Sequence, residues 1–154
     1  MNMNDATLVA PHSNDAALDS IINAIFQITN PKIAETRREE IRSFIKTTVN
    51  GDEIKAYLPT DANLKDRRGI LVYILTNRRL IKVEIDDKEI TSAFYFLTAM
   101  TGVERKLVEG NKASVQVSFQ NGSMGLRYSA TNQTITEFFQ KVEQVRSDGA
   151  NPNG

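Results

Sequence analysis

The spacing of hydrophobic residues changes near residue 50. Before that point, apolar residues recur every three or four positions, which is typical of one face of a helix. Two such stripes are present: Leu18, Ile21, Ile22, Ile25 and Phe26, then Ile33, Ile41, Phe44 and Ile45. Asn30-Pro31 between them is a helix-start signal, and Asn50-Gly51 after the second stripe is a helix-end signal. Residues 14–50 are therefore predicted to form a helical hairpin.

From Glu53 onward the apolar residues alternate with polar ones, which is typical of strands. Seven strands are predicted: 54–58, 70–76, 79–85, one within 89–97, one near 103–108, 112–119 and 124–130. The second strand is apolar on both faces, because Ile70 to Leu75 is an unbroken hydrophobic run. Asn121-Gly122 predicts a tight hairpin with both turn residues at positive φ. The short spacing of turns favours a meander that closes into a sandwich or barrel.

The last predicted element is a helix. Thr134-Ile-Thr-Glu137 has the spacing of a capping box, in which hydroxyl and carboxylate each bond a free amide. Its apolar face consists of Ile135, Phe138, Phe139, Val142 and Val145. Such a face needs a surface to cover, and the open end of a curved sheet supplies one. Residues 1–13 and 147–154 are predicted to be flexible tails.

Composition and charge narrow the functional classes. Nineteen basic and nineteen acidic side chains cancel, so the chain lacks the basic field of a dedicated nucleic-acid binder. The consecutive aromatics Phe94, Tyr95 and Phe96 point to both faces of their predicted strand, so some are expected in the core and one at the surface. They have few basic neighbours, so they also fit single-strand binding poorly. The absence of cysteine excludes disulfides and thiolate metal sites and fits the cytoplasm. The single histidine, His12, lies in the predicted tail, and no catalytic constellation can be assembled around it.

Seven strands followed by one helix resemble the order of a pleckstrin-homology domain. The segment Leu75-Thr-Asn-Arg-Arg-Leu80 resembles a strand-turn-strand signature of the bacterial members of that family, and Phe96 to Glu104 is similar to the lead into their fifth strand. The resemblance covers residues 52–146 and excludes the helical hairpin. It implies an α+β fold: a seven-stranded barrel or bent sandwich capped by a C-terminal helix. It also implies a binding or scaffolding module with no catalytic centre and no cofactor.

Four basic residues have a spacing similar to that of lipid-binding members of the family: Lys55, Lys65, Arg67 and Arg68. Basic side chains that converge on one phosphate form several charge-assisted hydrogen bonds. The resemblance therefore implies a site for an anionic headgroup between the first two predicted strands, and a peripheral membrane binder as the alternative function. Asp61 and Asp66 dilute the positive potential, so a solvated loop is the favoured interpretation of this segment.

Three further arginines are candidates for docking a protein partner: Arg78, Arg38 and Arg42. Arg78 is predicted at the tip of a turn with Asn77 in the left-handed region. Arg79 shares the parity of Ile81, Val83 and Ile85, which predicts a structural guanidinium at the sheet rim bonded to carbonyls or a carboxylate. Arg38 and Arg42 lie in the second predicted helix, where charges mostly form solvated ion pairs. Two roles stay open for the hairpin: covering the barrel, or self-association and partner docking.

Overall fold

The apolar run at 70–75 becomes the middle of a five-stranded antiparallel sheet. The computed structural model describes residues 8–9, 14–29, 32–64, 67–108 and 112–150. The strand order in this sheet is β1 (Leu8–Val9), β2 (Ile54–Leu64), β3 (Arg67–Thr76), β4 (Arg79–Ile85) and β5 (Ile90–Phe96). β3 is therefore central, and layers of other elements cover both of its faces, which accounts for its lack of polar positions.

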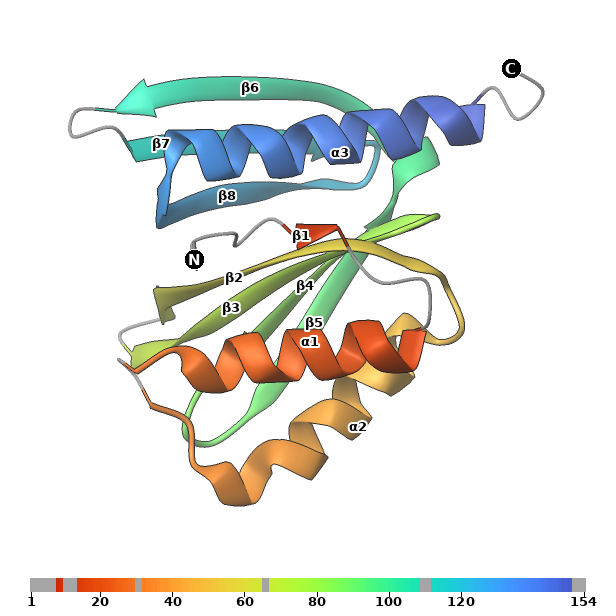
Figure 1. Cartoon of the computed structure of the whole chain (residues 1–154). Coiled ribbons are helices and arrows are strands. Elements are labelled where there is room, and N and C mark those ends of the chain that lie inside the picture. The colour runs from red at the N-terminus through yellow and green to blue at the C-terminus, as the bar shows by residue number, and fades with distance from the viewer. Residues whose placement is uncertain (1–7, 10–13, 30–31, 65–66, 109–111, 151–154) are drawn as a thin grey trace.

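The second sheet has three antiparallel strands in chain order: β6 (Met100–Val108), β7 (Lys112–Phe119) and β8 (Gly122–Thr131). The short helix η2 (Leu97–Ala99) connects it to β5. Helix α3 (Asn132–Ala150) then returns across this layer (Figure 1). Among the described residues no ladder joins the two sheets, so they form a bent sandwich rather than one closed barrel. The predicted α+β class, the seven strands and the C-terminal helix are confirmed.

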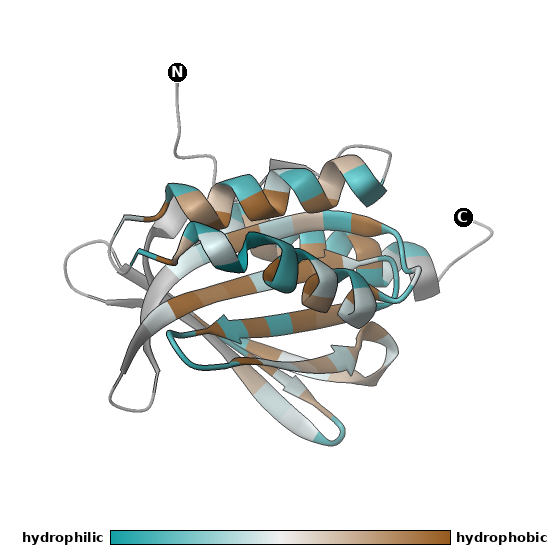
Figure 2. Cartoon of the chain, turned by 90° about the horizontal axis from the view of Figure 1, so that it is seen from below, coloured by the Kyte–Doolittle hydropathy of each residue, from teal (hydrophilic) through white to brown (hydrophobic). Residues whose placement is uncertain are grey.

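Helices α1 (Asn14–Gln27) and α2 (Arg38–Val49) cover the other face of the five-stranded sheet (Figure 1). The short helix η1 (Glu35–Arg37) leads into α2. Seen from the helical side, the helices carry alternating hydrophilic and hydrophobic segments, and the strands beneath them are largely hydrophobic (Figure 2). The predicted helical stripes therefore lie against the sheet. The second helix begins at Arg38, however, so the helix start expected at Asn30-Pro31 is wrong, and the buried Ile33 precedes the helix.

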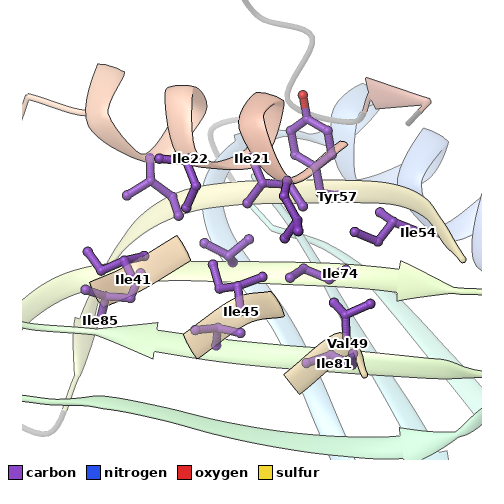
Figure 3. Close-up of a cluster of buried hydrophobic side chains, with 14 of the residues drawn as sticks. Ile21, Ile22, Ile41, Ile45, Val49, Ile54, Tyr57, Ile74, Ile81 and Ile85 are labelled. Carbon is purple, nitrogen blue, oxygen red and sulfur yellow. The ribbon is translucent and has the colours of Figure 1, made fainter. Parts of the chain in front are cut away.

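Two separate hydrophobic cores result, one on each face of the sheet. The outer core joins the hairpin to the sheet and is rich in isoleucine, with Ile41, Ile45 and Val49 of α2 lying over Ile81 and Ile85 of β4 (Figure 3). The inner core lies between the sheets and under α3; among its members are Leu58, Tyr73, Val117 and Phe138. Burying both faces of one sheet removes far more apolar area from water than a two-layer sandwich would.

Several local predictions are corrected. Leu8 and Val9, expected within a tail, pair with β2, and α3 extends through residues expected in the C-terminal tail. The turn between β7 and β8 was expected at Asn121-Gly122. It consists instead of Gln120 and Asn121, because Phe119 pairs with Gly122. Outside glycine, the only described residue with positive φ is Asn50, at 48°. The left-handed conformations expected for Asn77 and Asn121 are therefore wrong, whereas the Asn50-Gly51 helix end is confirmed.

Candidate groove between the β3–β4 turn, β5 and α3

A buried ion pair fixes the turn between β3 and β4. Arg79 is only 7% exposed and Asp52 only 6%. Nε of Arg79 donates to Oδ2 of Asp52 at 2.7 Å, and its Nη2 donates to the carbonyls of Thr48 and Val49 at 3.0 and 2.7 Å. These carbonyls belong to the last turn of α2, where a cation is favoured by the helix dipole. The structural role predicted for Arg79 at the sheet rim is confirmed.

Thr76 completes the turn. Its hydroxyl donates to Oδ2 of Asp52 at 3.1 Å and accepts the backbone N–H groups of Arg78 and Arg79. The side chain of Asn77 accepts the N–H of Glu53 at 3.0 Å, so this asparagine ties the turn to the residue that precedes β2 instead of supplying a left-handed backbone. The turn is therefore rigidly held and presents Arg78 outward.

Arg78 is the exposed cation of this turn. Its side chain is 60% exposed, and its Nη1 lies 3.5 Å from Oδ1 of Asp52. That separation is longer than an ordinary hydrogen bond. The guanidinium also lies over the ring of Phe96, 5.4 Å from its centroid. Arg78 was predicted to face solvent at the turn tip, and the structure places it at the margin of a groove.

Two phenylalanines lie exposed on β5, an edge strand whose only hydrogen-bonded neighbour among the described residues is β4. Phe94 is 44% exposed and Phe96 42%. Their rings contact edge to face at 5.6 Å, and Arg79 lies over the Phe94 ring at 4.6 Å. Tyr95, between them, points to the other face and stacks on Phe119. Exposed aromatics grouped on a strand edge are unusual for a surface with no partner.

A groove with a volume of about 480 Å³ adjoins the end of this strand. Its lining comes from the β3–β4 turn, the end of β5 with η2, and the last turns of α3: Asn77, Arg78, Phe96, Leu97, Thr98, Val145 and Arg146. The N–H of Leu97 donates to the carbonyl of Arg78 at 2.8 Å, which fixes the two walls relative to each other. The groove therefore combines apolar walls with two guanidinium groups.

The sequence did not predict most of the residues that line this groove. Arg78 was singled out, and one of the three consecutive aromatics was expected to be exposed. Leu97, Val145 and Arg146 were not identified as site residues, because nothing in their local pattern reports the packing of α3 beside the end of β5. Val145 was predicted on the apolar face of the last helix, which is the only signal that could have indicated it.

Arg38 and Arg42, the other predicted docking residues, have intramolecular partners. Arg38 contacts both oxygens of Glu35 and lies 4.5 Å from the centroid of the Phe26 ring. Arg42 pairs with Asp19 at 3.1 Å and with Asp15 at 3.8 Å, so it links α2 to α1. Both contribute to the packing of the hairpin on itself.

Of the predicted anion-binding residues, Lys55 lies far from Arg67 and Arg68. Lys65 lies outside the described residues, and Arg67 and Arg68 are described by their backbone at the start of β3. Lys55 lies at the opposite end of β2, next to Glu53 at 3.1 Å. Leu64 lies nine positions further along the extended strand, which corresponds to roughly 30 Å. Lys55 therefore does not share one site with Arg67 and Arg68.

Two observations bear on chemistry. In the described part of the chain there is no group of three or more His, Cys, Asp or Glu residues that could hold a metal ion. Burial raises the pKa of the Tyr57 hydroxyl above its usual value of 10.0, and a hydrogen bond with Ser20 opposes part of that shift. Tyr57 belongs to the outer core and stands beside α1 (Figure 3), so this shift reflects packing.

None of the described helices has the length and apolarity needed to cross a membrane.

Comparison with known proteins gives a limited result. No protein-family model matches the chain, and no curated protein matches it in sequence. Among solved structures it is similar to a DUF1696 family protein with a pleckstrin-homology domain from Shewanella loihica, with 13% identity and a TM-score of 0.46. The match covers 70% of this chain and 92% of that one. At this level of similarity no residue or activity can be transferred from that protein.

Proposed function

We propose that this chain is a non-catalytic protein-interaction module that receives a segment of its partner along β5 and in the adjoining groove. The observation that carries the proposal is the pair of exposed phenylalanines, Phe94 and Phe96, on an edge strand. An edge strand offers main-chain donors and acceptors to an added strand, and neighbouring pockets select its side chains. Aromatic anchors beside arginine are also the residues most enriched at energetically dominant contacts.

The hairpin supports this choice of surface. Its apolar stripes face the sheet, with Ile21, Ile25, Ile41 and Ile45 fully buried. They are therefore not available to bind a partner without unfolding. Of the two roles left open for the hairpin, covering the sheet agrees with the burial of its apolar residues. The surface proposed for partner docking is therefore β5 with the adjoining groove.

Site-specific photo-crosslinking in cells that express the full chain tests this function. A benzophenone amino acid is placed at Phe96, at Phe94 and, as a matched control, at the exposed Ser43 of α2. We expect a discrete protein adduct from the two β5 positions and none from position 43. Absence of adducts at both β5 positions, or the same adducts from all three, would contradict the proposal.

The basic residues near the connection between β2 and β3 support a second candidate function, which is reversible binding to an anionic membrane surface. β2 and β3 pair as far as Leu64 and Arg67, whereas β4 ends opposite Ile70. Arg67 and Arg68, at the start of β3, thus lie beyond the end of β4. Each basic residue near an anionic leaflet contributes about 1 kcal/mol, so three support only weak attachment.

Co-sedimentation with phosphatidylserine-containing liposomes at low and physiological salt tests the second candidate. Binding that is salt-sensitive, lost in a Lys65, Arg67, Arg68 to Ala variant and kept in Lys55→Ala is the expected result. Lys55 is the matched control because it lies at the other end of β2. Equal loss in both variants, or no binding by the intact chain, would reject it.

A further inference from the structure

We infer that the occupant of the groove is an extended acidic peptide segment, with a carboxylate two positions from an apolar side chain. This inference rests on the proposed function and specifies the chemistry of the partner. It follows from the charges at the β3–β4 turn, the lining of the groove and the alternation of side chains along an added strand.

The charges around Asp52 are unequal in number. This one buried carboxylate faces two guanidinium groups, those of Arg78 and Arg79. Arg79 has the shorter contact, at 2.7 Å, and completes its bonding with two carbonyls at the end of α2. Among the described carboxylates, Arg78 approaches Oδ1 of Asp52 alone, at 3.5 Å. One positive charge is therefore left incompletely neutralised at the margin of the groove.

The lining of the groove is positively charged. Among the described residues, the seven that line the groove include two arginines and no carboxylate. Arg146, the second cation, pairs with Glu143 at 3.3 Å across one turn of α3, and Glu143 does not line the groove. Exposed pairs with this spacing stabilise a helix only weakly, so Arg146 can turn toward an anionic ligand. Phe96, Leu97 and Val145 supply the apolar part of the wall.

The alternation of side chains along β5 sets the spacing of the residues that an added strand would present. Phe94 and Phe96 are two residues apart on one face of β5. A strand added beside β5 would place residues two apart on that same face, because side chains alternate. Arg78 lies over Phe96 at the groove end, which positions an acidic residue there and an apolar residue beside Phe94. Main-chain bonding along the strand edge favours a peptide over a lipid headgroup.

Selection from a phage-displayed library of random peptides on the immobilised full chain tests the inference. We expect enriched peptides to carry Asp or Glu two positions from an aromatic or aliphatic residue. Their affinity, measured by fluorescence anisotropy, should fall about tenfold or more in Arg78→Glu, because a charge-assisted hydrogen bond is replaced by repulsion. A peptide whose acidic residue is changed to Lys should bind Arg78→Glu better than it binds the wild type.

Lys88→Glu is the matched control. It makes the same charge change at an exposed position in the β4–β5 turn, at the other end of β5 from Phe96, and should leave the affinity unchanged. Because Arg78 is exposed, its replacement should leave the fold intact, which circular dichroism checks. Equal weakening by both charge changes would overturn the inference, since it would report overall charge and no local contact.

Other outcomes separate the inference from the function. Peptides that lose affinity in Phe96→Ser but show no acidic preference would overturn the inference and leave the function standing. No enriched peptide, or peptides indifferent to Phe96→Ser, would overturn both. Binding of phosphatidylserine vesicles that is lost in Arg78→Glu, without peptide binding, would assign the groove to a membrane surface and overturn the inference.

Discussion

At the scale of single residues, the junction of α2, β2 and the β3–β4 turn depends on Asp52. Its carboxylate accepts bonds from Arg79 and Thr76 and lies near Arg78. A buried ion pair contributes little net stability when it is compared with an apolar pair, but removing one partner leaves a costly uncompensated charge. Asp52 therefore supports both the fold and the presentation of Arg78.

Replacing Asp52 by Ala is expected to lower the free energy of unfolding by about 3–5 kcal/mol, because Arg79 loses its buried counter-charge. Urea denaturation measures the change. The double variant Asp52→Ala, Arg79→Met should cost clearly less than the sum of the single variants, since it removes both charges. Glu53→Ala, at the exposed neighbouring position, is the control and should change stability by about 0.5 kcal/mol or less. Additive single costs would contradict this role.

Tyr57 predicts a specific pH dependence. Burial raises the pKa of its hydroxyl in the folded state above the unfolded value of about 10, so folding favours the neutral phenol. Its contribution is therefore fully present below pH 10.0 and is lost as the pH rises through the folded pKa. Unfolding free energies measured from about pH 9 to 11 should fall more steeply for the wild type than for Tyr57→Phe. Parallel pH curves would show that Tyr57 does not titrate differently in the two states.

At the scale of elements, alternation and helical spacing in the sequence predicted which segments form strands and helices. Local signals were less informative at turns. Asn50 adopts the left-handed conformation expected of it, whereas Asn77 and Asn121 do not, because Asn77 bonds β2 and Gln120 takes the first turn position beside Asn121. Turn chemistry shows that a bend occurs, and tertiary contacts decide which residues form it.

The same limit applied to the groove. Arg78 was identified because it flanks a predicted turn, but the other walls of the groove come from residues far away in sequence. Val145 and Arg146 on α3 meet Leu97 and Thr98 only through the docking of α3 on the sandwich. The hydrophobic spacing within α3 does not predict where this helix docks. The sequence could therefore indicate an exposed arginine and an exposed aromatic, and not that they share one groove.

Gly122 tests how β5 meets the β7–β8 hairpin. A Cβ atom added at Gly122 would lie 2.6 Å from the Tyr95 hydroxyl oxygen and 3.0 Å from a ring carbon. Gly122→Ala is therefore expected to destabilise the protein by about 1–3 kcal/mol, because the stacked pair Tyr95 and Phe119 must shift. Thermal unfolding measures the loss. Tyr95→Phe removes the closest atom and should recover part of it in the double variant; no recovery would assign the cost to backbone effects at residue 122.

At the scale of the whole molecule, the five-stranded sheet is the layer that both cores share. Its inner face packs on the second sheet and α3, and its outer face packs on α1 and α2. This arrangement explains why β3 needs apolar residues at every position from Ile70 to Leu75, all of them buried. β3 contributes residues to both cores, so a change that disturbs this strand affects the packing on both faces of the sheet. The hairpin shares a hydrophobic core with the sheet even though the family resemblance excludes it.

Deleting residues 1–50 tests whether the sandwich can exist alone. The deletion would expose the apolar outer face of the sheet, including Ile70, Val72, Ile74, Ile81 and Val83, which are fully buried in the intact chain. It would also remove the two carbonyls that accept bonds from Arg79. We expect the shortened chain to aggregate or lose cooperative unfolding, because an exposed patch of this kind is incompatible with a soluble monomer. Size-exclusion chromatography and near-UV circular dichroism report the two effects.

Ile45→Ala supplies a milder test of the same dependence in the full-length chain. Ile45 is fully buried between α2 and the sheet, so the substitution should cost about 2–5 kcal/mol while β5 and the groove keep their residues. If the sheet depends on the hairpin, this variant should unfold in one transition at lower urea, as seen by probes in both cores. A first transition confined to the helices, followed by unfolding of an intact sandwich, would show that the hairpin folds as an appendage to an independent module.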